Sequence, residues 1–249
     1  MLIELIGCTS AGKSTLAQNM LKSNPKNAIN LVSSDDFVLR WAHLDWVKQK
    51  NVRKLFLNLL ALPACLLTWR KNRLFYRFVV GVLLRQTPRI SRFEKLKIAR
   101  ITARNVGIFE IVRRHKTDQQ VVLADEGTLH IANYLFVHVS SEPDMKDLEI
   151  FVQLVSLPDV AIYLKQPESV LISRTKIRGH KRIPSNSSAP IYQFIRNSLA
   201  VFEKLIESSS LEGRLVIVNE QKVVVPSMGY TDPQGLEFAR KIIDLKSTT

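Results

Sequence analysis

Short apolar runs recur along the chain, and longer stretches of mixed apolar and polar residues separate them. The apolar runs cover residues 1–6, 29–32, 121–124, 160–164 and 215–218. Runs of this length indicate buried strands, because a buried helix needs a longer one. Buried strands that alternate with helices are typical of a parallel sheet covered on both faces. The pattern therefore predicts an α/β fold with a five-stranded parallel sheet flanked by helices.

The stretches between these runs carry the helical spacing of apolar residues. It predicts helices over residues 13–22, 167–178, 191–208 and 234–245. Asn24 and Pro25 follow the first helix and are expected to end it. Gly179 follows the second helix and is expected to end that one.

The segment 39–119 does not fit this alternation. It is long, helical in composition, and contains two apolar pieces, Leu55–Trp69 and Leu74–Leu84. Both are shorter than the roughly 20 residues of a bilayer-spanning helix. Either they pack against the rest of the protein, or they form a basic amphipathic surface on anionic lipid. Four neighbouring residues suit a headgroup boundary and suit a substrate lid equally well: Trp69, Arg70, Lys71 and Arg73.

Composition and length favour one domain over residues 1–249, with a core of 1–38 and 120–249 and a basic helical insert of 39–119. The net charge is +14, and residues 40–120 hold 19 Lys and Arg against 4 Asp and Glu. The whole positive excess thus lies in one segment. Such asymmetry indicates an anionic partner, and the alternatives are a nucleotide, a sugar phosphate, an acidic lipid and a nucleic acid. The alternative is a solvated basic surface.

Cysteine usage bears on the compartment. Cys8 lies inside a glycine-containing loop, where a disulfide to Cys65 would hinder a ligand, so we expect two thiols in a reducing cytosol. The first residues resemble a strand and contain Glu4, without the basic region and cleavage site of a signal peptide. We therefore expect a cytoplasmic protein.

The first strand runs into a phosphate-binding pattern. Residues 7–14, GCTSAGKS, match G-x-x-x-x-G-K-[ST] between a predicted strand and a predicted helix. The glycines let successive N–H groups face phosphate oxygens, and the helix adds its positive end. Lys13 is expected to reach the β- and γ-phosphates. The predicted nucleotide-binding residues are Gly7, Cys8, Thr9, Ser10, Ala11, Gly12, Lys13, Ser14 and Thr15.

Carboxylates follow the third predicted strand in VVLADEG. In a phosphate-loop protein, the Ser14 hydroxyl and an acidic residue at another strand end hold Mg²⁺. Asp125 and Glu126 are the candidates. The alternative is that one of them only caps a helix that begins at Gly127.

Two further carboxylates end the second predicted strand in VSSDDF. Asp35 or Asp36 could accept the proton of an attacking hydroxyl as a general base. Alternatively, both belong with Ser34 to a helix N-cap, and the two roles are compatible.

Basic residues cluster at the end of the helix 167–178. Arg174 and Arg178 lie four residues apart on one helix face, and Arg182 follows beside Lys181. A basic helix end that leads into the polar stretch 183–190 would close over phosphates and spread transition-state charge. A solvated basic face is the alternative.

The histidines and cysteines predict no further site. His130 and His180 lack a recognisable catalytic partner in the sequence, so we expect both to be structural or surface residues. The chain has neither zinc-ligand spacing nor the G-x-S-x-G of serine hydrolases.

With these parts in order, the chain resembles the nucleoside and nucleotide kinase branch of the P-loop proteins. GCTSAGKST resembles the phosphate loop, VSSDDF the acidic segment of uridine-kinase-like members, and residues 158–182 the strand, helix and arginine lid of thymidylate-kinase-like members. The likeness covers residues 1–38 and 120–218. It departs at Asp125-Glu126, where many relatives have Asp-Arg, and in the insert, which matches no known acceptor-binding segment.

The resemblance implies a P-loop kinase that uses ATP with Mg²⁺ and transfers the γ-phosphate to a small acceptor. The basic insert favours an anionic acceptor, such as a nucleotide, a sugar or a glycan intermediate. Lys13, Asp35 or Asp36, Arg174, Arg178 and Arg182 are the expected catalytic residues. The alternative is a nucleotide-dependent switch that docks on an anionic membrane or, less favoured, on nucleic acid through the insert.

Overall fold

The computed structural model describes residues 1–22, 30–85, 90–183, 188–219 and 223–224. The helix predicted at 234–245 lies outside these residues, as does the Asn24-Pro25 helix stop. Five strands run parallel: β1 (Leu2–Ile6), β2 (Asn30–Ser33), β3 (Gln120–Ala124), β4 (Val160–Leu164) and β5 (Leu215–Val218). A two-residue strand, β6 (Val223–Val224), pairs antiparallel with β5.

The sheet has the order β2-β3-β1-β4-β5-β6, with β1 in the middle. Ile3 lies opposite Leu123 on one side and Val160 on the other, and all of β1 and β4 is buried. This burial explains why β4 is a continuous apolar run and why β1 is apolar except at Glu4. The predicted five-stranded parallel sheet is confirmed. Its parallel direction brings the segments after β1, β2 and β3 to the same edge.

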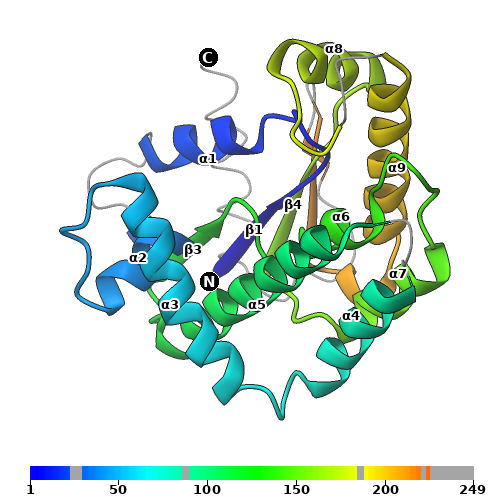
Figure 1. The fold of residues 1–249 in the computed structure, drawn as a ribbon. Helices are drawn as coiled ribbons and strands as arrows, with labels where there is room; N and C mark the ends of the chain where they lie inside the picture. Colours follow the sequence, from blue (N-terminus) through cyan, green and yellow to red (C-terminus); the bar gives the residue numbers. More distant parts are fainter. Residues whose placement is uncertain (23–29, 86–89, 184–187, 220–222, 225–249) are drawn as a thin grey trace.

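Helices cover both faces of the sheet (Figure 1). In the core they are α1 (Lys13–Lys22), α2 (Ser34–Trp41), α6 (Ile131–Phe136), α7 (Met145–Leu154), α8 (Glu168–Arg178) and α9 (Ser188–Ile206), followed by the 3-10 turn Ser209–Leu211. Gly179 ends α8 with a φ of +70°, as predicted. The prediction that α9 begins at Ile191 was wrong by three residues, because the first turn of a helix tolerates a proline such as Pro190.

The basic insert folds into three helices, α3 (Lys50–Leu67), α4 (Arg73–Arg85) and α5 (Arg92–His115). Helix α3 continues through Pro63 and packs across α5 (Figure 1). Leu57, Ala61 and other apolar residues of α3 form a core with α2 and α5. Among the helices that the structure describes, none combines the length and hydropathy that a bilayer crossing requires. Both cysteines are free thiols.

The crossing of α3 and α5 depends on Gly107. A Cβ atom at this position would lie 2.0 Å from the backbone oxygen of Ala61. Only the missing side chain lets the two helices approach this closely, so Gly107→Ala should force them apart. We expect it to lower the free energy of unfolding by about 3 kcal/mol, as overpacking against backbone does.

Urea denaturation followed by circular dichroism measures this loss. Gly81→Ala in α4 is the matched control, because a Cβ there meets no atom within 4 Å. It should leave stability unchanged or raise it by about 0.5 to 1 kcal/mol through helix propensity. Equal effects of the two substitutions would show that the crossing tolerates a side chain.

Candidate functional site

The loop between β1 and α1 has the backbone of an anion-binding site. Gly7, Ser10 and Gly12 all have positive φ, at 140°, 65° and 95°. Such turns direct successive N–H groups into one concavity, and α1 adds the positive end of its dipole. Gly7 also has a packing reason, since a Cβ there would lie 2.9 Å from the Leu164 oxygen of β4. The geometry fits a phosphate group.

Lys13 lies inside this loop. Its Nζ donates to the carbonyl oxygens of Gly7 at 2.8 Å and Cys8 at 2.9 Å, and the residue is buried. Burial lowers the pKa of Lys13, although the nearby carboxylates of Glu126 and Asp125 oppose the shift. Burial raises the pKa of the Cys8 thiol to about 11, so it stays protonated and unreactive. An ammonium held by the carbonyl oxygens of a loop that also offers N–H groups is suited to a polyanion.

Ser14 and Asp125 meet beside the loop, as the phosphate-loop pattern requires. The Ser14 Oγ donates to Asp125 Oδ2 at 2.7 Å, although 111 residues separate them. Asp125 Oδ1 is buried and has no hydrogen-bond partner among the described residues. Burial raises the pKa of Asp125, and the bond from Ser14 partly offsets the rise.

This pair fits Mg²⁺ in the presence of a nucleotide. Magnesium is held by one or two protein oxygens together with phosphates and water. Within the described ranges, no three or more His, Cys, Asp or Glu side chains form a metal site by themselves. A hydroxyl beside a carboxylate with an unpartnered oxygen therefore suits a cation that phosphates share.

Glu126 contacts residues other than Ser14. It accepts a hydrogen bond from the Tyr134 hydroxyl at 2.9 Å, and the His130 Nε2 lies 3.7 Å from its carboxylate. Neither Asp125 nor Glu126 caps a helix at Gly127, so that alternative is wrong. Helix α6 begins at Ile131, and a different carboxylate binds the N–H groups before it.

That carboxylate is Glu4, which is fully buried in the middle of β1. It accepts from the backbone N–H of Leu129 at 3.2 Å and of His130 at 2.9 Å. It also explains Gly127, because a Cβ there would lie 2.5 Å from the Glu4 carboxylate. Glu4 therefore fixes the turn that follows Asp125 and Glu126.

Burial raises the pKa of Glu4 from 4.5 to about 7, against the opposing effect of its hydrogen bonds. Between these two pH values the folded chain binds more protons than the unfolded chain, so the Glu4 contribution to stability falls as pH rises. Relative to Glu4→Gln, the wild type should lose about 3 kcal/mol of unfolding free energy from about pH 4.5 to about pH 8.

Denaturation curves of both proteins across this range measure the difference. Comparing the two cancels the other titrating groups, since these are common to both. Parallel stability curves would show that Glu4 does not titrate in the folded state.

The two carboxylates after β2 have different roles in the fold. Both carboxylate oxygens of Asp35 accept a hydrogen bond from the Arg104 guanidinium of α5, each at 3.1 Å. Asp36 accepts from the Ser33 hydroxyl at 2.6 Å and pairs with Arg53 of α3. The N-cap of α2 is Ser33, whose Oγ accepts from the Asp36 N–H.

The pKa values of these two acids shift in opposite directions. Burial raises the pKa of Asp35, and the Arg104 charge opposes this. Burial would also raise the pKa of Asp36, but hydrogen bonds from Ser33 and Arg53 outweigh it and lower the value. A proton acceptor needs the higher affinity for a proton, which favours Asp35.

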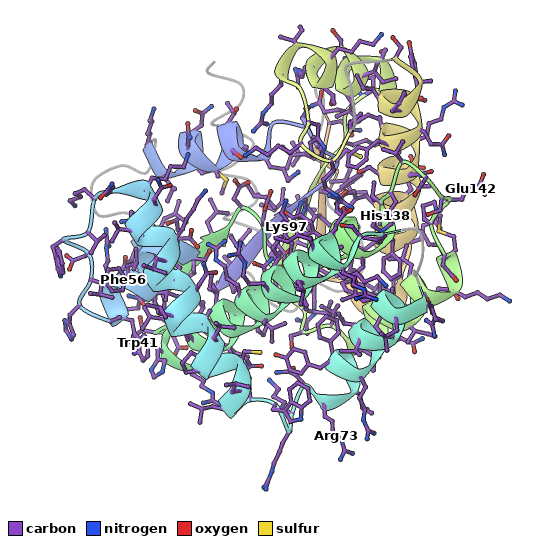
Figure 2. The ribbon with its side chains drawn as sticks, viewed as in Figure 1. Trp41, Phe56, Arg73, Lys97, His138 and Glu142 are labelled. Carbon is purple, nitrogen blue, oxygen red and sulfur yellow. The ribbon has the colours of Figure 1, made fainter. Side chains whose placement is uncertain are left out.

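A cavity of about 720 Å³ opens over the phosphate loop. Residues 9–15 form its floor, Lys97 and Ile101 of α5 form one wall, and residues 178–182 form another. Glu126, His130 and Tyr134 complete it. Lys97 lies near the centre of the molecule on the α5 side (Figure 2). This cavity is called the donor cavity below.

Both histidines that we expected to be structural or surface residues line this cavity. His130 is buried against Phe202, and burial together with the charges of Lys13 and Arg182 lowers its pKa well below the usual value. His180 packs on Phe194, and burial lowers its pKa to about 4. Both rings are therefore neutral at physiological pH.

Of the three arginines that we expected to close over phosphates, two line the donor cavity. Arg178 lines the donor cavity with an exposed side chain. Arg174 is exposed and lies outside the set of described residues that line it. The Arg182 guanidinium lines the cavity but donates to the carbonyls of Asn133 at 3.0 Å and Val137 at 2.6 Å. It thus caps α6, and a phosphate-binding role for the three arginines stays a prediction.

A second cavity, of about 640 Å³, adjoins the first and is called the acceptor cavity, after the role proposed for it below. The two cavities share Ile101, Glu126 and Tyr134. The second is lined by Asp35, Asp125 and several residues of the insert: Asn51, Lys54, Leu55, Asn58, Arg100 and Arg104. Among the described residues, neither Lys54 nor Arg100 forms an ion pair. The acceptor cavity is therefore basic and polar on the insert side.

These insert residues were missed in the sequence because only the fold brings them to the site. A signal existed in α5, where Lys97, Arg100, Ile101 and Arg104 follow the helical spacing of a single face. Nothing in the sequence distinguished this basic face from a solvated one. Tyr134 and Glu4 belong to no sequence motif that would have indicated a place in the site.

Comparison with known proteins gives a fold likeness of low score. No protein-family model matches the chain, and no curated protein matches it. A deoxyadenosine kinase from M. mycoides with bound dATP is 12% identical over 98% of this chain and 100% of that chain, with a TM-score of 0.42. A shikimate kinase from Acinetobacter baumannii in complex with shikimate is 14% identical over 99% and 93%, with a TM-score of 0.37. The chain has a P-loop fold. This assignment rests on its own features, namely the strand order and the phosphate loop after β1.

Proposed function

We propose that the chain is an ATP-dependent kinase that transfers the γ-phosphate to a hydroxyl or phosphate of a small anionic acceptor. The observation that carries this proposal is the pair of adjoining cavities. One has the phosphate loop as its floor, and the other is lined by Asp35 and by basic residues of the insert. They share a wall at Glu126 and Tyr134, where a donor phosphate and an acceptor would meet.

Each residue group has one task in this proposal. The loop N–H groups and Lys13 bind the β- and γ-phosphates, and Arg178 and Lys97, which line the same cavity, add positive charge. Ser14 and Asp125 would hold Mg²⁺, which when bound neutralises charge on the phosphates. Where the acceptor group is a hydroxyl, Asp35 accepts its proton, and Arg104 holds the Asp35 carboxylate in place. Lys54 and Arg100 attract and orient the anionic acceptor.

The reducing compartment that the sequence predicts belongs to the same proposal. A cytoplasmic location supplies ATP and keeps Cys8 a thiol.

A screen of phosphorylated sugars, nucleosides, nucleotides and glycan intermediates tests the function. ADP release should be slow with ATP alone and rise at least tenfold with an acceptor of the correct class. Phosphorylated acceptors should be better substrates than their neutral counterparts, because Lys54 and Arg100 have no ion-pair partner among the described residues. Hydrolysis that is equal with and without every acceptor would favour the nucleotide-dependent switch instead.

A further inference from the structure

The outer face of α3 is apolar, although the helix is already packed on its inner face. Leu57, Ala61 and Cys65 are buried against the rest of the protein. Leu62 and Leu66 lie on the other side, 41% and 69% exposed, and Leu67 is 78% exposed. A helix that packs on one side and remains apolar on the other has a second surface to cover.

This apolar surface continues around the turn into α4. Trp69 is 45% exposed and Leu74 is 60% exposed. The Trp69 ring stacks on Tyr76, with centroids 4.8 Å apart and planes 7° apart, so the fold holds it in place. We call the five residues Leu62, Leu66, Leu67, Trp69 and Leu74 the hairpin tip. It lies near Arg73, on the lower rim of the molecule in Figure 2.

The charged residues of the sequence around the hairpin tip have a single sign. The chain has 11 Lys and Arg and no Asp or Glu between Asp45 and Glu94. Lys71 is paired with the buried Glu110 of α5 at 3.0 Å. Arg70, Arg73 and Arg77 are exposed and form no ion pair within the described part of the chain. The tip therefore combines exposed leucines and a tryptophan with exposed arginines.

We propose that the hairpin tip docks on an anionic phospholipid bilayer. The leucines and Trp69 would lie at the boundary of headgroups and acyl chains, and the arginines would contact lipid phosphates. Nucleic acid fits less well, since a groove or a single strand offers no apolar volume for four leucines. The surface is separate from the phosphate loop and does not depend on the kinase proposal.

Docking would also place the acceptor cavity near the membrane. Helix α3 carries both features, with Asn51, Lys54 and Asn58 in the cavity and Leu62 and Leu66 at the tip. An acceptor at the membrane surface would then lie close to the cavity, because the same helix contacts both.

Vesicle sedimentation of the full chain tests this proposal. Binding to phosphatidylcholine vesicles that contain phosphatidylserine should be at least tenfold tighter than to phosphatidylcholine alone, and should weaken at high salt. Arg70→Gln should weaken it about fivefold, as should Arg73→Gln, the effect of one basic residue at an anionic surface. The double variant Leu66→Ser/Leu67→Ser should weaken it about tenfold or more.

The control is Ile177→Ser, which removes an apolar side chain that is 85% exposed on α8, outside the tip. It should leave vesicle binding unchanged. Lys13→Ala should also bind vesicles like the wild type, so failure of docking and failure of the kinase proposal are distinguishable. Circular dichroism of each variant checks that it is folded.

A second measurement does not depend on the leucine variants. In Trp41→Phe/Trp46→Phe, Trp69 is the remaining tryptophan. Its fluorescence should shift to shorter wavelength on anionic vesicles and be quenched by brominated acyl chains. Absence of vesicle binding would overturn the proposal, as would equal binding by the tip variants and the wild type. Self-association or RNA binding through the tip without vesicle binding would overturn it as well.

Discussion

Lys13→Ala is expected to lower acceptor phosphorylation by about 10³-fold or more, because a buried donor to the transferring phosphates is worth several kcal/mol. The Lys13 ammonium is held among the loop carbonyls, where no other described side chain replaces it. Its removal leaves the loop without a cationic side chain, so that only N–H groups and hydroxyls remain as donors there. The measurement is the rate of ADP formation at saturating acceptor, with nucleotide binding followed separately by calorimetry.

The matched control is Lys22→Ala, at the exposed end of the same helix. This variant should keep the wild-type rate and stability. Normal turnover in Lys13→Ala would contradict the assignment of the loop as the donor site.

Asp35→Asn is expected to lower the rate of transfer to an acceptor hydroxyl by about 10²-fold, the lower range for loss of a general base. The effect is smaller than that of Lys13→Ala, because phosphoryl transfer depends mainly on positioning and charge. The amide keeps the shape of the side chain and removes its ability to accept a proton. The rate should also lose its rise with pH in the range where Asp35 ionises.

Asp36→Asn is the matched comparison one residue along α2. Its carboxylate is engaged by Ser33 and Arg53, and it lies outside the set of described residues that line the acceptor cavity. This variant should lose stability and keep most of its rate. If Asp36→Asn has the larger effect on the rate, the roles of the two acids are reversed.

Features that depend on local sequence could be predicted. The phosphate loop is set by Gly7, Gly12 and Lys13 within one strand–loop–helix unit, and the apolar runs predict the five parallel strands. The closeness of Ser14 to the acidic pair after β3 follows from the shared edge of parallel strands, but the sequence left Asp125 and Glu126 both as candidates. The capping alternative failed because Glu4, from a neighbouring strand, binds the N–H groups in question.

Features that depend on packing between distant segments could not be predicted. Arg104 of α5 reaches Asp35 of α2 across 69 residues, and α5 also crosses α3 closely at Gly107. A glycine inside a helix has no local signature for such a crossing. The hydrophobic pattern of α3 was also ambiguous, because one face packs and the other is exposed. Packing against the rest of the protein, the first of the two interpretations of the insert, applies to the inner face of α3. The second, a surface on anionic lipid, stays a prediction for the outer face.

The most direct measurement of the central account follows labelled γ-phosphate from ATP to its product. With an acceptor of the correct class, the label should appear in an organic product in equal amount to the ADP formed. Arg100→Met should raise the acceptor KM and leave ATP binding unchanged, since Arg100 lines the acceptor cavity. Label that appears only as inorganic phosphate, at a rate independent of every acceptor, would contradict the account.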